Sequence, residues 1–153
     1  MSEGTVVTHD HPVLGSHGVV RVTVDPRWDP VRYEDLTVVV LDDGRKIVSC
    51  VPLLATNVNL GDVIETVEDP STGRSEYGRR VDRGQAWVFR IIPNDEAAFR
   101  LAHDLIHEFR GAVESWWKIT AVAIRGDEAA GAFAERLQRL QDAGVLDWET
   151  AEQ

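Results

Sequence analysis

His103 and His107 lie four residues apart, which is the spacing that metal ligation on one face of a helix requires. In the zinc protease motif of this spacing, a glutamate that acts as general base follows the first histidine, and Asp104 stands at that position here. A third ligand is also needed; Glu114 or Glu128 could serve, although nothing in the sequence places either nearby. We therefore expect the two histidines on a solvated helix flank and keep a metal-dependent hydrolase that uses them as an alternative.

Three further histidines, His9, His11 and His17, lie near the N-terminus and could bind a divalent ion. They belong to residues 1–17, which show no hydrophobic period and which we expect to form a mobile arm. The entropy lost on ordering such an arm opposes a tight metal site. We predict no bound metal.

The chain has a single cysteine, Cys50, so it can form neither an intrachain disulfide nor a zinc site built mainly on thiolates. We expect Cys50 to be a small buried residue. The sequence also has neither a nucleophile-elbow motif nor a phosphate-binding glycine loop. We therefore predict no catalytic residues and no cofactor.

The charge of the chain is acidic and unevenly distributed. Its 153 residues include 16 Lys and Arg against 26 Asp and Glu, which gives a formal net charge of −10. This balance argues against binding to nucleic acid, which needs a basic footprint, and it permits a basic protein partner. Residues 74–90 are nevertheless basic and include Arg79 and Arg80, whereas residues 127–153 are strongly acidic.

The chain has five tryptophans, which is many for its length. Trp116 and Trp117 are adjacent, so on a strand their side chains point to opposite faces and at least one leaves the core face. Trp148 raises the same question on the last expected strand. An exposed tryptophan with acidic neighbours is typical of a protein-binding hot spot, although a barrel packed on the sheet could bury all of them. Our candidate partner-binding residues are Trp116, Trp117, Trp148, Glu149, Arg79 and Arg80.

The first half of the chain has the alternating, β-branched pattern of strands and little helical periodicity. Asp42-Asp43-Gly44-Arg45 is typical of a hairpin turn. We predict an all-β subdomain over residues 18–84 that forms a small β-barrel or a curled antiparallel sheet. Its expected strands are residues 18–24, 36–41, 46–51, 61–67 and 75–81.

The second half alternates between strands and helices. The predicted elements follow the order β-α-β-β-α-β, which is that of the ferredoxin-like fold, with two helices on one face of a four-stranded sheet. Asn94 is the expected helix cap, and Gly111 is expected to end the first helix. We predict an α+β fold in which this ferredoxin-like subdomain, residues 85–153, packs with the first half as one unit. Its expected elements are residues 85–92, 95–110, 113–124 (two strands), 126–143 and 145–150.

Four short stretches of the chain form a recognisable set of motifs. They are Val51-Pro52-Leu53-Leu54, Gly61-Asp62-Val63-Ile64, Thr120-Ala121-Val122-Ala123-Ile124 and Gly144-Val145-Leu146-Asp147-Trp148-Glu149. Together they resemble a bacterial family known as domain of unknown function 4265, over about residues 33–150. The resemblance implies that the two halves belong to one recurrent unit, and it implies no activity and no catalytic residues.

The first residues lack the basic and apolar regions of a signal peptide, and the longest apolar runs are too short to cross a bilayer. We expect a cytoplasmic protein that does not bind membranes. Our leading hypothesis is a non-catalytic, acidic protein-binding protein, most concretely an immunity or antitoxin-type inhibitor that masks a toxin or enzyme with a basic cleft. The alternatives are a small-molecule-sensing regulatory domain with its ligand at a sheet or dimer seam, and the metal-dependent hydrolase. The oligomeric state is left open.

Overall fold

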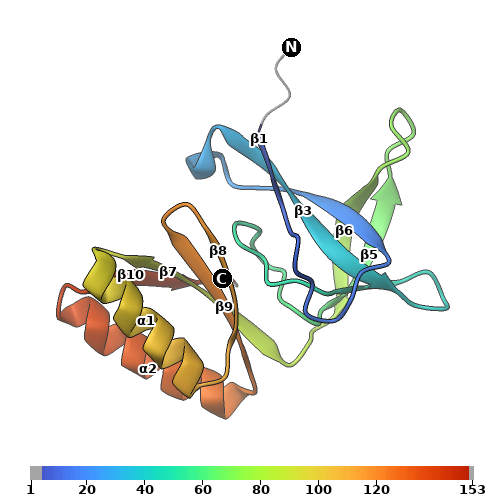
Figure 1. Cartoon of the computed structure of the whole chain (residues 1–153). Helices are drawn as coiled ribbons and strands as arrows, with labels where there is room; N and C mark the ends of the chain where they lie inside the picture. Colours follow the sequence, from blue (N-terminus) through green and yellow to red (C-terminus); the bar gives the residue numbers. More distant parts are fainter. Residues whose placement is uncertain (1–4, 152–153) are drawn as a thin grey trace.

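The computed structural model describes residues 5–151, which form an α+β fold with a β-barrel at one end and two helices at the other (Figure 1). Residues 1–4 and 152–153, which the predicted arm and C-terminal unit include, lie outside the described residues. The first half contains β1 (Thr5–Thr8), β2 (Gly18–Thr23), the 3-10 helix η1 (Pro26–Trp28), β3 (Val31–Val40), β4 (Lys46–Val48), β5 (Val63–Glu68) and β6 (Ser75–Asp82). The second half contains β7 (Ala86–Pro93), α1 (Glu96–Glu108), β8 (Ala112–Trp116), β9 (Ile119–Arg125), α2 (Asp127–Asp142) and β10 (Leu146–Thr150).

The first sheet closes into a five-stranded barrel, in the order β3-β2-β6-β5-β4 and back to β3. This confirms the barrel alternative of the sequence analysis. Val20 and Val22 of β2 and Leu36 and Val38 of β3 face inward because a period of two puts every second side chain on one face. The barrel core comprises Val20, Val22, Leu36, Val38, Val48, Cys50, Ala55, Val58 and Ile64.

The N-terminal segment differs from the expected mobile arm in the residues that the structure describes. Thr5–Thr8 forms β1, which pairs in parallel with the first half of β3. Val7 is 3% exposed and belongs to the central core, and this burial offsets the entropy of ordering the segment. Further along, the backbone N–H of Val13 donates to Ser49 O at 2.7 Å, and that of His17 donates to Val38 O at 2.8 Å. The described part of this segment is therefore held to the barrel by strand pairing and backbone hydrogen bonds, which the expected arm did not include.

The second sheet has the strand order β10-β7-β9-β8, and each neighbouring pair is antiparallel. Both helices cover one face of it (Figure 1). Phe89 and Ile91 face the helices as their phase predicts, and Trp87 packs at the edge of the same cluster. No helix in residues 5–151 is long and apolar enough to cross a membrane.

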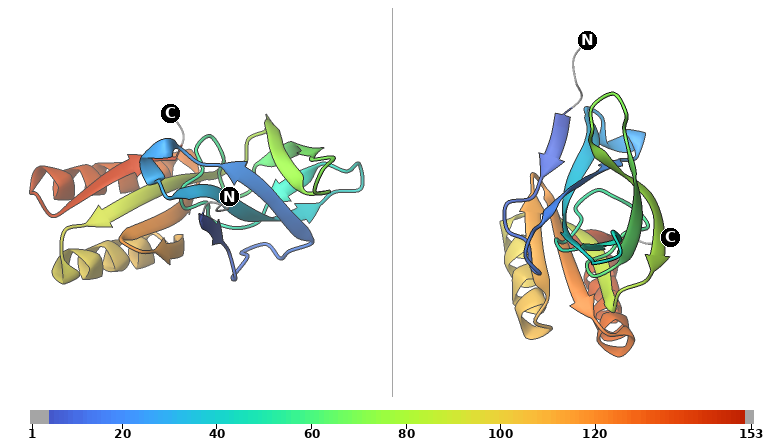
Figure 2. Two further views of the ribbon diagram at one scale, coloured as in Figure 1. Left: turned by 90° about the horizontal axis from the view of Figure 1, so that it is seen from above. Right: turned by 90° about the vertical axis from the view of Figure 1, so that its right-hand side faces the viewer.

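The other face of the second sheet packs against the barrel and the segment that follows β4. Val88, Ala121 and Ala123 share a core cluster there with Val51 and Leu53. The sheet thus lies between the helices and the barrel, as the two views of Figure 2 show. The two sheets share one core, so the burial of either depends on the other.

The close approach of two glycines fixes the connection between the sheets. A Cβ on Gly84 would lie 2.6 Å from the carbonyl carbon of Gly61, nearer than packed atoms come. Asp62, next to Gly61, accepts a hydrogen bond from the N–H of Gly84 at 2.7 Å. Only a residue without a side chain fits at position 84.

The ends of α1 differ in detail from the expectation. Asp95, not Asn94, caps the helix by accepting a hydrogen bond from Ala98 N at 2.8 Å. The side chain of Asn94 instead donates to Gly144 O. At the C-terminal end, the left-handed residue is Arg110, with φ of 55°, and not Gly111.

Candidate functional site

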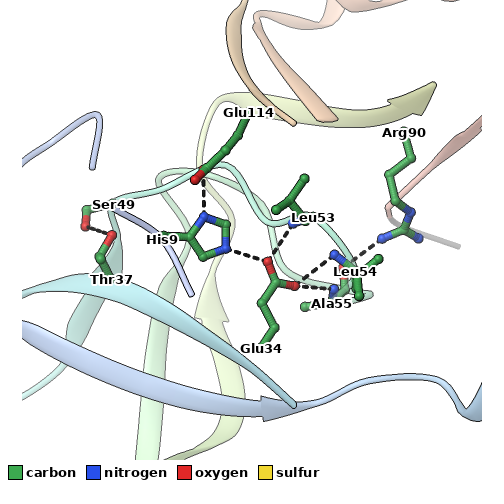
Figure 3. Close-up of polar contacts among 9 residues, drawn as sticks. All are labelled: His9, Glu34, Thr37, Ser49, Leu53, Leu54, Ala55, Arg90 and Glu114. Carbon is green, nitrogen blue, oxygen red and sulfur yellow. Dashed lines mark hydrogen bonds and ion pairs between the residues drawn. The ribbon is translucent and has the colours of Figure 1, made fainter. Parts of the chain in front are cut away.

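A buried histidine joins the three parts of the molecule. His9 follows β1, and its Nε2 lies 2.6 Å from Glu34 Oε2 on β3, while its Nδ1 lies 2.6 Å from Glu114 Oε2 on β8 (Figure 3). The side chains of His9 and Glu34 are fully buried, and that of Glu114 is 18% exposed. The N-terminal segment, the barrel and the second sheet therefore meet at one imidazole ring.

The geometry requires the imidazolium form of His9. An ionised carboxylate only accepts hydrogen bonds, so contacts to two carboxylates need a proton on both ring nitrogens. Burial by itself would lower the pKa of His9, but the nearby Cys50 and the hydrogen bonds to Glu114 and Glu34 outweigh it and raise the pKa to about 12. His9 thus carries its positive charge between the two carboxylates across the neutral pH range.

Glu34 also fixes the loop that follows β4. Its Oε2 accepts from Leu53 N at 2.7 Å, and its Oε1 accepts from Leu54 N at 2.8 Å and Ala55 N at 2.7 Å (Figure 3). With His9, the carboxylate has four hydrogen-bond donors, which replace the water that burial removes. The inward direction of the Glu34 side chain could be predicted from the sequence, because Glu34 is in phase with the inward-facing Leu36 and Val38.

A second buried charge stands beside this loop. Arg90 on β7 is 1% exposed; its Nη1 donates to Ala55 O at 3.1 Å and its Nε donates to Glu149 Oε1 at 2.8 Å. Arg27 of η1 reaches the same carboxylate. Burial tends to raise the pKa of Glu149, but the hydrogen bonds and charges of Arg27 and Arg90 lower it overall. Glu149 is therefore a structural ion-pair partner that links β10 to the barrel.

A groove opens beside Glu114, between the segment around β1 and the edge strand β8. Its volume is about 510 Å³. Both β1 and β8 lie at the ends of their sheets. The groove is lined by Val6, Val7, Thr8, Asp10, His11, Leu53, Val113, Glu114, Ser115 and Trp116.

The two adjacent tryptophans stand at the tip of the hairpin between β8 and β9. Trp116 packs partly against the central core and lines the groove. Trp117 is 74% exposed and has φ of 52°, a left-handed conformation in which glycine and asparagine are usual. Its ring centroid lies 5.1 Å from Lys118 Nζ. The hairpin therefore presents a large apolar side chain to solvent at the end of the groove.

The other residues expected to bind a partner lie elsewhere. Trp148 packs against the helical core, with its ring centroid 5.9 Å from that of Phe89. β10, which carries Trp148 and Glu149, is at the opposite edge of the sheet from β8. Arg79 and Arg80 lie on β6 of the barrel, where Arg79 pairs with Glu65 and Arg80 with the buried Asp62. Of the predicted set, only Trp116 and Trp117 lie at the hairpin between β8 and β9.

The histidines with metal-ligand spacing are not gathered into a larger set. Across residues 5–151, no group of three or more His, Cys, Asp or Glu side chains could hold a metal ion. His103 is half-buried and stacks on Phe99 at 4.2 Å, and His107 is exposed. His17 Nδ1 accepts from Val40 N at 3.2 Å, and His11 lies in the groove.

The structure defines a class of protein in which a β-barrel and a second sheet share one core and are joined at His9. The pattern of the family described as "Domain of unknown function (DUF4265)" matches residues 34–148, and the chain belongs to this family, as its motifs indicate. The match begins at Glu34 and covers the loop, Arg90 and Glu114, but not His9. No curated protein is similar enough to this chain to count as a relative.

The same fold occurs in a solved structure. It is described as "Novel crystal structure of a hypothetical protein from Neisseria gonorrhoeae" and is similar to this chain with a TM-score of 0.73 and 16% sequence identity. The similarity covers 94% of this chain and 96% of the other. It therefore extends over the barrel and the second sheet together.

Proposed function

We propose that this chain is a non-catalytic protein-binding protein whose contact surface is the β8–β9 hairpin with the groove beside it. The observation that carries the proposal is Trp117, 74% exposed and held in a left-handed conformation at the hairpin tip. That conformation costs about 1–2 kcal/mol for a residue with a side chain. The indole also gives up the stabilisation that burial would provide. A side chain kept in place at this expense is best explained by a partner.

The neighbours of Trp117 supply the rest of a contact surface. Tryptophan is enriched among binding hot spots, and these sit beside well-packed residues that exclude water. Trp116 provides such a base, with its ring centroid 6.2 Å from that of Trp117. β8, at the edge of its sheet, offers the kind of strand that pairs with an extended segment of a partner.

The charge of the surface favours a basic partner. Asp10 lines the groove, Glu114 beside it is paired with His9, and the chain as a whole has a net charge of −10. Acidic inhibitors of this kind are steered rapidly onto basic clefts. In its most concrete form, the proposal is an immunity or antitoxin-type inhibitor that acts in the cytoplasm and inserts Trp117 into the cleft of a toxin or enzyme.

We also propose that the second sheet with its helices is a ferredoxin-like unit. The strand order β10-β7-β9-β8 with every neighbouring pair antiparallel supports this assignment, as does the element order β-α-β-β-α-β. A superposition of residues 85–151 on ferredoxin-like domains tests it. A mismatch in the handedness of either βαβ crossover would overturn the assignment.

Affinity capture from cells of the source organism tests the binding function. We expect the wild-type protein to retain one partner in stoichiometric amount, and Trp117→Ala and Trp117→Gly to lose it. Calorimetry with the purified partner should show a loss of about 2 kcal/mol or more in binding free energy. Trp117→Gly removes the side chain while relieving the backbone, so its loss of binding cannot be ascribed to misfolding.

The matched control is Val67→Ala on β5, because Val67 is also a highly exposed apolar residue, at 64%. It should bind the partner as the wild type does. Capture of no stoichiometric protein, or equal capture by the wild type and both Trp117 variants, would overturn the proposal. If a saturating amount of this protein left the enzymatic activity of the partner unchanged, the inhibitor form of the proposal would be overturned and the binding role would remain.

A further inference from the structure

A second concave site lies on the barrel-facing side of the second sheet, between that face and the N-terminal segment. Its volume is about 400 Å³, within the range of small-molecule sites. It is lined by Val13, Leu14, Leu60, Gly61, Gln85, Ala86, Arg110, Ala112, Ala123 and Arg125. It shares no lining residue with the groove beside Trp116.

Three alanines on three neighbouring strands form the floor of this pocket. Ala86 on β7 pairs with Arg125 on β9, and Ala112 on β8 pairs with Ala123 on β9. Larger side chains at these positions would fill the space between the sheet and the N-terminal segment, since interiors pack at close to crystal density. The pocket therefore exists because this end of the sheet carries only methyl groups.

Two arginines stand at the same end of the pocket. Arg110 precedes β8 and Arg125 ends β9, each two residues beyond the pair Ala112 and Ala123, so the antiparallel register brings them to one edge. Within the described part of the chain, neither guanidinium takes part in a hydrogen bond or an ion pair, although acidic residues far outnumber basic ones in the sequence. The lining residues, all of which lie in that part, include no Asp or Glu.

The backbone of Arg110 adds a separate indication. Its φ of 55° places it at the left-handed residue after α1, where glycine is the usual choice. No side chain fits at the next residue, Gly111, because a Cβ there would clash with Val122. Arginine thus occupies a position where its guanidinium makes no hydrogen bond or ion pair within the described residues and its backbone is strained.

We propose that this pocket binds an organic anion with an apolar body, such as a medium-chain or aryl carboxylate. Arg110 and Arg125 would hold the carboxylate, because guanidinium groups bind it through paired, charge-assisted hydrogen bonds. The apolar body would lie on the alanine floor and cover Val13 and Leu14, which are 48% and 46% exposed. The site is independent of the proposed function, because it uses neither the hairpin nor the groove.

Titration of the isotope-labelled full chain, followed by amide chemical shifts in ¹H–¹⁵N spectra, tests the proposal with sodium octanoate as the probe. We expect saturable shifts at Ala86, Ala112 and Ala123. Octan-1-ol, which has the apolar body without the charge, and inorganic phosphate, which has the charge without the apolar body, should both bind more weakly. Arg110→Gly and Arg125→Gln should each weaken octanoate binding about tenfold.

Arg110→Gly separates ligand binding from structural support. It removes the guanidinium and relieves the left-handed backbone, so the thermal midpoint should stay the same or rise while affinity falls. Arg74→Gln is the control, because Arg74 is exposed on the barrel and its loss changes the net charge equally. Absence of saturable shifts at the three alanines, equal affinity for octan-1-ol or phosphate, or an equal effect of Arg74→Gln would overturn the proposal.

Discussion

At the scale of single residues, two buried side chains carry a positive charge. His9 lies between two glutamates, and Arg90 lies between a backbone carbonyl and Glu149. Burial removes both side chains from water, so each depends on partners from distant parts of the chain. Replacing one partner leaves a buried charge without compensation, which makes these positions sensitive to substitution.

His9→Gln is expected to destabilise the fold strongly. The substitution removes the positive charge between Glu34 and Glu114, and breaking a buried ion pair from one side costs about 3–5 kcal/mol. Urea denaturation measures this loss as a lower midpoint with an unchanged slope. His11→Gln is the control, since His11 is exposed. Similar midpoints for the two variants would refute the assigned role of His9.

The stability of the wild-type protein should fall as the pH rises above neutrality. Folding raises the pKa of His9 from 6.5 to about 12. The contribution of His9 to the free energy of unfolding is therefore complete below pH 6.5. It is lost as the pH rises from 6.5 to about 12, because the unfolded chain releases its proton first. The expected slope from this group is about 1.4 kcal/mol per pH unit. Denaturation series from about pH 7 to about pH 9 would reveal it. A wild-type slope no steeper than that of His9→Gln would contradict the linkage.

At the scale of elements, the period of the sequence predicts most strands and both helices. β2 and β5 alternate and the helices carry apolar stripes because each has one buried face, whereas β3 is indicated by its β-branched apolar run. β1 escapes prediction because it is only four residues long, too short for a period to be recognised. Arg110 replaces Gly111 as the left-handed residue because Gly111 is needed for close packing on β9.

The contacts of the site were harder to predict than its elements. Glu34 could be placed inward from its phase in β3, whereas its contact with His9 spans 25 residues and that of His9 with Glu114 spans 105. Such pairings depend on how the two sheets dock, which no local pattern encodes. The adjacent tryptophans, in contrast, can be identified from the sequence. The turn geometry that exposes Trp117 cannot be predicted from it.

Two glycine substitutions should have opposite effects on stability. Gly84→Ala forces a Cβ against the backbone of Gly61 and should lower the free energy of unfolding by more than about 2 kcal/mol. Gly131→Ala lies in α2 with no atom within 4 Å of the added Cβ and should raise it by about 0.5–1 kcal/mol. Thermal denaturation of both variants measures the difference. A tolerated Gly84→Ala would show that the link between the sheets can shift.

At the scale of the whole molecule, the barrel and the second sheet are expected to be stable only together. The sheet buries Val88, Ala121 and Ala123 against residues from the first half, and Arg90 relies on Ala55 for one of its hydrogen bonds. This mutual burial agrees with a family match that runs from one half into the other.

A fragment of residues 85–153 is therefore expected not to fold alone. Its barrel-facing surface would be exposed to water, and the burial that stabilises it would be lost. Its ¹H–¹⁵N spectrum should be poorly dispersed, whereas that of the full chain should be well dispersed. A dispersed spectrum with native-like shifts in β7 and β9 would show that the sheet and helices form an independent domain.

The position of His9 in the chain also has a consequence for how the protein is made. His9 leaves the ribosome before Glu114, which follows 105 residues later. Until then, the nascent barrel can offer His9 only one of its two carboxylates, and the loop held by Glu34 has no sheet to pack against. The segment around His9 is thus synthesised before the second sheet but is fully held in place only when that sheet is complete.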